Sequence, residues 1–187
     1  MSRLELLTTP HYRVSRVGEI PADALGRLGI RAVLLDVDNT LVEWHGEVVP
    51  PETAAWVRRL LQAGVKCCLL SNTHRPRRLV KLAKDLAIEF VPAGRKPFPW
   101  GYREAMARLG VSPAETAMIG DQLLTDILGG NAQGLTTILV DPISPREFWG
   151  TRVVHRTLER WLFRRMAKAG VRPAGLKTSP NGTSEDQ

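Results

Sequence analysis

The chain contains few cysteines, and their placement argues against a scaffold held together by disulfides. Only two of its 187 residues are cysteines, and they are neighbours, Cys67 and Cys68, inside a short apolar run. Adjacent cysteines in such a run are poorly placed to pair with each other. We therefore expect two buried, reduced thiols without a catalytic role, as in proteins of reducing compartments.

Long apolar runs are also missing. No stretch approaches the roughly 20 consecutive apolar residues that a membrane-spanning helix needs. The first 20 residues contain no apolar core of the kind found in secretory signals. We therefore expect a cytoplasmic protein, peripheral at most at the inner face of the membrane. Internal repeats are absent as well, and a hydrophobic content of 43% is ample for one globular domain.

Acidic residues are the scarcer charge, with 19 Asp and Glu against 26 Lys and Arg, a net charge of +7 and a pI near 10.0. Much of the excess lies between positions 146 and 172, where eight basic side chains accompany two acidic ones. We predict a basic amphipathic helix at 146–170, followed by a disordered tail at 171–187. Four arginines share one face of this helix: Arg152, Arg156, Arg160 and Arg164. Two interpretations stay open, since the helix could lie on anionic lipid or pack its apolar stripe on the domain.

From residue 31 onward, short apolar runs alternate with helical patterns. This alternation is typical of right-handed βαβ units, which build a parallel sheet covered by helices. Five strands are predicted, at 32–36, 66–70, 88–91, 116–119 and 136–140. Helices are predicted at about 51–62, 77–86, 102–109 and 123–131. The core then spans 31–145, residues 1–30 pack on it or lead into it, and a turn at 44–47 forms a small flap.

Two carboxylates stand where the first predicted strand ends, in the run Asp36-Val37-Asp38-Asn39-Thr40. Alternation along an extended chain points Asp36 and Asp38 to the same side, where their charges repel unless a cation or a proton is present. The alternative is a helix cap or a turn, because Asp, Asn and Thr are common capping residues.

Polar side chains also follow three further strands, at the edge where parallel sheets bind ligands. Ser71 and Asn72 follow the second strand and could hold a phosphate oxygen, although they are equally ordinary capping residues. Lys96 follows the third strand and, taken alone, would be an ordinary solvated lysine. Asp121 and Asp126 follow the fourth strand and offer oxygen ligands to a hard cation such as Mg²⁺. An acid at position 126 would also be favoured by the helix dipole alone.

Four such motifs at successive strand ends resemble those of the haloacid dehalogenase (HAD) superfamily of phosphatases: DxDxT, Ser, Lys and GDxxxxD. The resemblance covers about 30–140 and implies an α/β three-layer Rossmannoid sandwich. A closer resemblance is to the YqeG family of subclass IIIA, through its Asp-x-Asp-Asn-Thr-Leu motif, in which Asn39 replaces the Gly of most relatives. That family is similar to phosphatidylglycerophosphatases, which remove the terminal phosphate of phosphatidylglycerophosphate.

The resemblance also implies roles for individual residues. Asp36 would be the nucleophile that forms an aspartyl phosphate, and Asp38 the general acid and base. Mg²⁺ would be held by Asp36, the backbone carbonyl of Asp38 and Asp121, with Asp126 bound through a water. Lys96 would pair with Asp36 and the phosphate. The implied catalytic set is Asp36, Asp38, Ser71 and Lys96, and the implied substrate-binding residues are Asn39, Thr40 and Asn72.

The segments between the motifs, 40–71 and 71–96, are too short for the cap domains that many members of the superfamily carry. An open site favours a phosphate presented on something large. Such a phosphate could belong to a lipid headgroup, a protein or a nucleic-acid end. Because the resemblance implies the lipid, the leading hypothesis is a Mg²⁺-dependent phosphatase of phosphatidylglycerophosphate, in phosphatidylglycerol and cardiolipin synthesis. The alternatives are a HAD phosphatase of nucleic-acid ends or soluble metabolites, and a basic RNA- or ribosome-associated binding protein on a HAD scaffold. The retained carboxylates favour an enzyme, because clustered charges destabilise a fold that makes no use of them.

Overall fold

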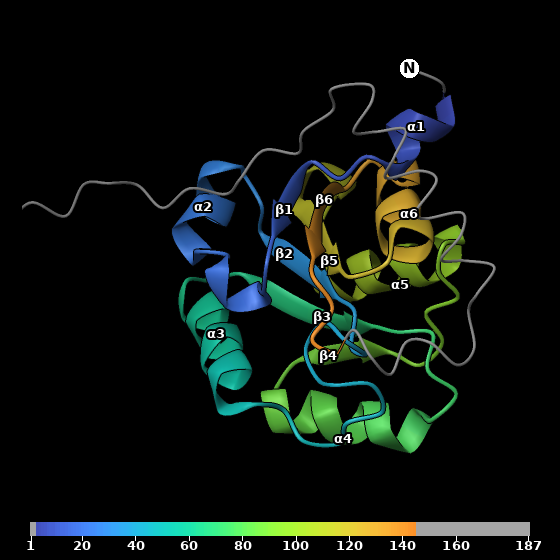
Figure 1. Cartoon of the computed structure of the whole chain (residues 1–187). Coiled ribbons are helices and arrows are strands. Elements are labelled where there is room, and N and C mark those ends of the chain that lie inside the picture. The colour runs from blue at the N-terminus through green and yellow to red at the C-terminus, as the bar shows by residue number, and fades with distance from the viewer. Residues whose placement is uncertain (1–2, 145–187) are drawn as a thin grey trace, which may run out of the picture.

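The structure is a computed structural model in which residues 3–144 are described. The predicted basic helix at 146–170 and the tail at 171–187 lie outside the described residues. Within them, six parallel strands form one sheet in the order β1-β6-β5-β2-β3-β4 (Figure 1). The strands are β1 (Tyr12–Val14), β2 (Ala32–Leu35), β3 (Lys66–Leu70), β4 (Glu89–Val91), β5 (Thr116–Gly120) and β6 (Thr136–Val140).

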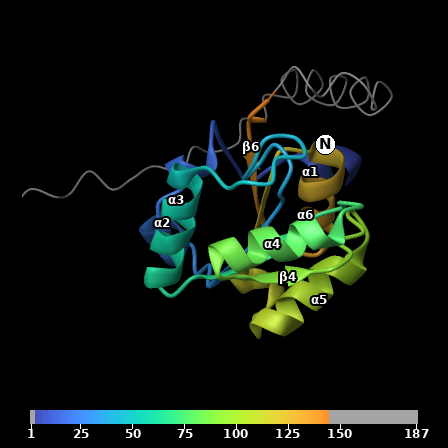
Figure 2. The ribbon, with the colours of Figure 1, turned by 90° about the horizontal axis from the view of Figure 1, so that it is seen from below.

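Helices cover both faces of the sheet, so the expected α/β three-layer architecture is confirmed (Figures 1 and 2). One side carries α2 (Ala22–Arg27), α3 (Pro51–Gln62) and α4 (Pro76–Leu86), and the other carries α1 (Arg3–Thr8), α5 (Pro99–Leu109) and α6 (Leu128–Ala132). Three short turns complete the described chain: η1 (Val17–Glu19), η2 (Pro113–Glu115) and η3 (Leu123–Ile127), the last a π-helical turn.

The central strand β2 explains how the core and the site are joined. Val33 and Leu35 belong to the hydrophobic cluster under α3 and α4, whereas Ala32 and Leu34 belong to the cluster under α5. All four side chains are fully buried, which is why this strand is a continuous apolar run in the sequence. Its last apolar residue is followed directly by Asp36, which therefore lies at the carboxyl edge of the sheet.

The prediction of five strands was wrong, because β1 adds a sixth. It pairs in parallel with β6, with Tyr12 opposite Ile138. The strand has three residues, and its central Arg13 is exposed and forms a salt bridge with Asp141. No apolar run marks such an edge strand in the sequence, so its position depends on the pairing with β6.

Two of the predicted helices differ from the structure by more than a single residue at one end. Helix α5 begins at Pro99, three residues before the predicted start at 102, because proline is well suited to a first helical turn. The helix predicted at 123–131 is divided into η3 and the short α6. Such π-helical turns are frequent at functional sites.

No separate cap domain is present among residues 3–144. Only a loop at 36–50 joins β2 to α3, and only 71–75 join β3 to α4. The first loop contains the flap, residues 41–50, whose turn is closed by a 2.8 Å hydrogen bond from the Gly46 N–H to the Glu43 carbonyl. Across the described part of the chain, none of the helices has the length and apolar character required to traverse a bilayer.

Candidate active site

Four loops meet at the carboxyl edge of the sheet, because β2 lies between β3 and β5 and β4 adjoins β3. A pocket of about 520 Å³ opens there. Five residues proposed from the sequence line it, namely Asp36, Asp38, Ser71, Asn72 and Lys96. Its other lining residues are Trp44, His45, Thr73, His74, Arg75, Gln122 and Thr125.

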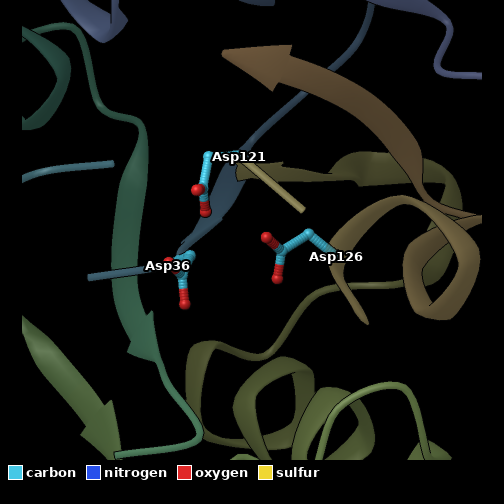
Figure 3. A group of neighbouring side chains, drawn as sticks. All are labelled: Asp36, Asp121 and Asp126. Carbon is cyan, nitrogen blue, oxygen red and sulfur yellow. The ribbon is translucent and has the colours of Figure 1, made fainter. Parts of the chain in front are cut away.

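Three carboxylates converge beside this pocket (Figure 3). Asp36 follows β2, Asp121 follows β5 and Asp126 lies in η3, and each offers one oxygen within 4.8 Å of the other two. Asp36 Oδ2 and Asp121 Oδ1 are buried and accept no hydrogen bond within the protein. Unpaired buried carboxylate oxygens are costly, and oxygen ligands of this kind are those that a hard divalent cation prefers. These residues therefore fit a divalent cation.

A glycine makes the approach of Asp126 possible. A Cβ atom built on Gly120 would lie 2.2 Å from Asp126 Oδ2, far closer than real Cβ contacts. The same carboxylate accepts a 3.1 Å hydrogen bond from the backbone N–H of Gln122, which fixes its orientation. Gly120 and Asp126 of the GDxxxxD motif are thus linked by packing as well as by sequence.

Lys96 is the buried cation among these acids. Its Nζ lies 2.5 Å from Asp36 Oδ1 and 2.7 Å from Asp126 Oδ1, and the residue is only 5% exposed. Burial opposes its charge, but the carboxylates of Asp126 and Asp36 outweigh that effect and raise the pKa of Lys96 above its usual range. One lysine therefore serves two carboxylates, with a third nearby.

The single positive charge of Lys96 does not balance the three neighbouring carboxylates. Burial raises the pKa of Asp36 to about 6, a rise that the charge of Lys96 limits and that of Asp126 increases. Burial, followed by the charges of Asp36 and Asp126, also raises the pKa of Asp121 well above its usual range. A bound divalent cation would supply the missing positive charge.

Asn72 holds the loop that carries Lys96. Its Nδ2 donates to the Lys96 carbonyl and its Oδ1 accepts from the Lys96 N–H, both at 2.8 Å. Nearby, the Gly94 N–H donates to the Ser71 carbonyl at 3.1 Å, and a Cβ on Gly94 would lie 2.5 Å from that oxygen. These contacts join the loops after β3 and β4, and a contact of Asn72 with substrate stays a prediction.

Arg78 is a site residue that the sequence analysis missed. Its Nη1 and Nη2 donate to Asp38 Oδ2 and Oδ1 at 3.1 and 2.9 Å, and its Nε donates to the Gly46 carbonyl at 2.7 Å. The Asp38 carboxylate also accepts from the His45 N–H at 2.9 Å. Arg78 therefore ties Asp38 and the flap to α4.

A signal for Arg78 exists in the sequence. The residue precedes Leu82 and Leu86 by four and eight positions, which places it on the apolar face of its helix. Its side chain is 3% exposed in the structure. A charged side chain in phase with an apolar stripe needs a buried partner, and Asp38 is that partner.

Comparisons with known proteins agree with this geometry. The probable phosphatase YqeG of Bacillus subtilis (strain 168) is 32% identical over 161 residues, which span 86% of this chain and 92% of that protein. The chain belongs to the YqeG family. A family model described as HAD-hydrolase-like matches residues 93–142. The chain is thus a HAD-type phosphatase, a phosphoric monoester hydrolase.

Two further similarities extend the comparison of this YqeG-family chain. The chloroplastic phosphatidylglycerophosphate phosphatase 1 of Chlamydomonas reinhardtii is 28% identical over 186 residues, which span 95% of this chain and 69% of that protein. The crystal structure of an uncharacterized protein from Listeria monocytogenes serotype 4b aligns with a TM-score of 0.51 at 18% identity. That alignment covers 72% of this chain and 99% of the other, and at this identity it shows the fold alone.

The YqeG-family asparagine, Asn39, now has a structural explanation. Its φ is +61°, a left-handed conformation that glycine adopts freely and asparagine tolerates better than most residues. Its carbonyl accepts from the Ile143 N–H at 3.1 Å, and its Oδ1 accepts from the Ser144 N–H at 3.3 Å. Asn39 therefore ties the loop after β2 to the segment that follows β6.

Asn39 and Thr40 are buried, at 0% and 2% exposure, and neither lines the pocket. Asn39 Nδ2 and Thr40 Oγ1 are buried without a hydrogen-bond partner in the protein. The pocket lining includes His74 and Arg75 from the loop after β3 and the Trp44–His45 ring pair of the flap. Substrate contacts of Asn39 and Thr40 stay predictions.

Proposed function

We propose that this phosphatase is Mg²⁺-dependent and removes the terminal phosphate of phosphatidylglycerophosphate through an aspartyl phosphate on Asp36. The observation that carries this proposal is the convergence of three carboxylates, two of them buried and one partly buried, and of Lys96 beside the pocket. The chloroplastic relative, which is named for this substrate, supports the choice of phospholipid. So does the lack of a cap domain among residues 3–144, since an open site can accept a headgroup held in a membrane.

The proposed chemistry has two steps on the Asp36 side chain. A carboxylate oxygen of Asp36 attacks phosphorus in line with the ester bond, and the P–O bond to the glycerol oxygen breaks. Asp38 enters the first step protonated and donates that proton to the departing oxygen. The resulting carboxylate then takes a proton from the water that hydrolyses the aspartyl phosphate, which restores the protonated form. The Arg78 pair and the His45 N–H hold the Asp38 carboxylate at the pocket wall, where it can serve both steps.

The other residues would stabilise the charge of the transferring group. Lys96 is already placed against Asp36, and the Ser71 hydroxyl, which lines the pocket, can donate to a phosphate oxygen. Mg²⁺ would be held by Asp36, Asp121 and the carbonyl of Asp38, with Asp126 acting through a water. When bound, it would neutralise the negative charge that builds on the phosphoryl oxygens.

The proposal is tested by phosphate release from phosphatidylglycerophosphate in mixed micelles, with Mg²⁺ and with a chelator in its place. Asp36→Asn serves as the inactive control, and a 3′-phosphorylated oligonucleotide and a soluble sugar phosphate are offered in parallel. We expect Mg²⁺-dependent release from the lipid, lost in Asp36→Asn. Release from the oligonucleotide or the sugar phosphate alone would support the phosphatase chemistry and contradict the proposed lipid substrate. Release that is unaffected by the chelator would contradict the proposed dependence on Mg²⁺.

A further inference from the structure

Two aromatic side chains near the pocket are exposed to an extent that the phosphatase chemistry does not require. Phe98 is 58% exposed and Trp100 is 61% exposed, and their rings contact each other with centroids 5.7 Å apart. They lie at the junction of the loop after β4 and the start of α5. Neither residue lines the pocket. A contacting pair of large exposed aromatic rings is typical of a surface that meets a partner.

This pair is fixed close to the reacting groups by the backbone. Lys96, two residues before Phe98, has its amino group in the site, and Asn72 holds the Lys96 backbone on the loop after β3. The Phe98 N–H donates to the Arg95 carbonyl at 2.9 Å, which closes a turn between them. The aromatic pair is therefore anchored to the same two loops that form one side of the pocket.

Basic side chains outnumber acidic ones around the pair, and the exposed acid nearest in the sequence is Glu104, one helical turn after Trp100. The segments 71–78 and 92–103 contain no Asp or Glu. Their exposed basic residues are Arg75, Arg77, Arg95 and Arg103. Exposed acids are found instead in the flap, at Glu43 and Glu47. The loops after β3 and β4 thus present positive charge and aromatic surface, and the flap presents negative charge.

We propose that Phe98 and Trp100, with Arg95 and its basic neighbours, form a docking surface for an anionic membrane. A tryptophan ring is suited to the headgroup boundary, a phenylalanine ring to the acyl chains beneath it, and arginines to anionic headgroups. The surface follows directly on the loop that carries Lys96 into the site, so docking would hold the site close to the headgroups. This inference rests on the proposed lipid substrate and adds how the enzyme reaches it.

Single-stranded nucleic acid is the other macromolecule that basic and aromatic side chains can attract. Its bases stack on open aromatic faces. Here the two rings contact each other at an interplanar angle of 49°, so they do not form a parallel slot for a base. Phe98 also has no polar atom with which to read a base edge, whereas hydrocarbon accepts it readily. The geometry therefore favours the membrane.

A local probe can report docking independently of catalysis. The two native cysteines are buried, so a Phe98→Cys change in the full chain can be labelled selectively with an environment-sensitive dye. The matched control carries the dye at Leu6→Cys, an exposed apolar position in α1. We expect vesicles containing phosphatidylglycerol to raise and blue-shift the emission at position 98 and to leave position 6 unchanged. Pure phosphatidylcholine vesicles should have a weaker effect, because they offer no net negative charge.

Binding and activity complete the test. The double change Phe98→Ser with Trp100→Ser should weaken flotation with phosphatidylglycerol vesicles at least about tenfold, since it removes two large apolar side chains from the contact. It should lower phosphate release from vesicle-embedded substrate and leave hydrolysis of p-nitrophenyl phosphate unchanged. The matched double change Leu4→Ser with Leu6→Ser should alter neither.

The outcomes separate this proposal from the proposed function. Dye emission at position 98 that responds to an oligonucleotide and not to vesicles would overturn the membrane proposal and identify nucleic acid as the docking partner. Emission that responds to neither, or equal flotation of the two double variants, would overturn the docking surface and leave the lipid substrate standing. An emission change at position 98 on vesicles, without hydrolysis of the lipid, would support the docking surface and contradict the proposed lipid substrate.

Discussion

Single residues decide how the acids of this site are held. Asp38 is surrounded by three fixed donors, the two guanidinium nitrogens of Arg78 and the N–H of His45. Bidentate arginine–carboxylate pairs fix orientation as well as charge. In the proposed reaction, that orientation determines whether Asp38 can reach the leaving oxygen. Arg78 is therefore a positioning residue, which acts on substrate through Asp38.

Replacing Arg78 by methionine should lower kcat by about 100-fold with little change in KM, since a misplaced acid costs about that much. It should also lower the free energy of unfolding by about 3 kcal/mol, because the Asp38 carboxylate loses its buried partner. Steady-state kinetics and urea unfolding measure the two effects. Lys84→Met, at an exposed position of the same helix, is the control. A wild-type kcat in Arg78→Met would contradict the positioning role.

The two cysteines give a prediction about pH. Burial raises the pKa of both Cys67 and Cys68 to about 12, from an ordinary value of 9.0. Little thiolate is therefore available at pH 8, and a disulfide reagent such as DTNB should react only as fast as the protein opens. Rapid labelling of two thiols in the absence of denaturant would contradict the burial of these side chains.

The same shift predicts the sign of an effect on stability. Between about pH 9 and 12 the unfolded chain releases thiol protons that the folded chain keeps, so the free energy of unfolding falls as pH rises through this window. Below pH 9 the thiols contribute no such slope. Urea unfolding at pH 8 and 10.5 measures it, and a Cys67→Ala, Cys68→Ala variant should lose less stability over that interval than the natural chain. An equal loss in both proteins would refute the assignment to the thiols.

At the scale of elements, the amino-terminal segment is attached to the sheet by side chains from the opposite end of the described chain. Asn131 Nδ2 donates to the carbonyls of Leu7 and Thr9 at 2.7 and 2.9 Å, and its Oδ1 accepts from Thr137 Oγ1 at 2.8 Å. The His11 ring lies 2.9 Å from the same hydroxyl. These bonds hold α1 and the start of β1 against α6 and β6.

Removing the Asn131 amide should loosen this attachment. Asn131→Ala is expected to lower the free energy of unfolding by about 2–3 kcal/mol, because it removes three hydrogen bonds and leaves polar groups unpaired. It should also increase hydrogen exchange in residues 7–14 more than in β2. Gln133→Ala, just beyond the same helix, is the matched control and should change the unfolding free energy by less. Unaltered exchange in residues 7–14 would show that other contacts hold this segment.

At the scale of the whole molecule, the fold brings together carboxylates that are far apart in the sequence and that repel one another at close range. Asp36 and Asp121 come from loops after adjacent strands, and Lys96 compensates only part of their charge. A ligand that binds the folded state alone stabilises it in proportion to the logarithm of its concentration. The same site should therefore couple metal binding to global stability.

Mg²⁺ at about 100 times its dissociation constant should add about 2.7 kcal/mol to the free energy of unfolding. Thermal unfolding with and without Mg²⁺ should show this as a rise in Tm. Asp121→Asn should remove most of the rise, because it removes one of the three converging carboxylates. Asp85→Asn, an exposed acid of α4, should keep it. A rise that is equal in the two variants would place the metal elsewhere.

Sequence patterns alone were sufficient to predict the parallel α/β architecture and the edge of the sheet at which the candidate site lies. Buried parallel strands are continuous apolar runs, and the residues that end them must meet at one edge of the sheet, so Asp36, Lys96 and Asp121 could be placed together from local patterns. The strand β1 could not be found in this way, because three residues with a central arginine carry no apolar pattern and depend on pairing with β6.

Tertiary structure alone decided which partners these residues have. Arg78 turns inward because the flap and Asp38 pack over α4, and Asn72 supports Lys96 because the loops after β3 and β4 lie in contact. Phe98 and Trp100 are exposed just after the loop that carries Lys96 into the site. Such relations join residues from different loops and helices, and they depend on distances in space that spacing along the chain does not encode.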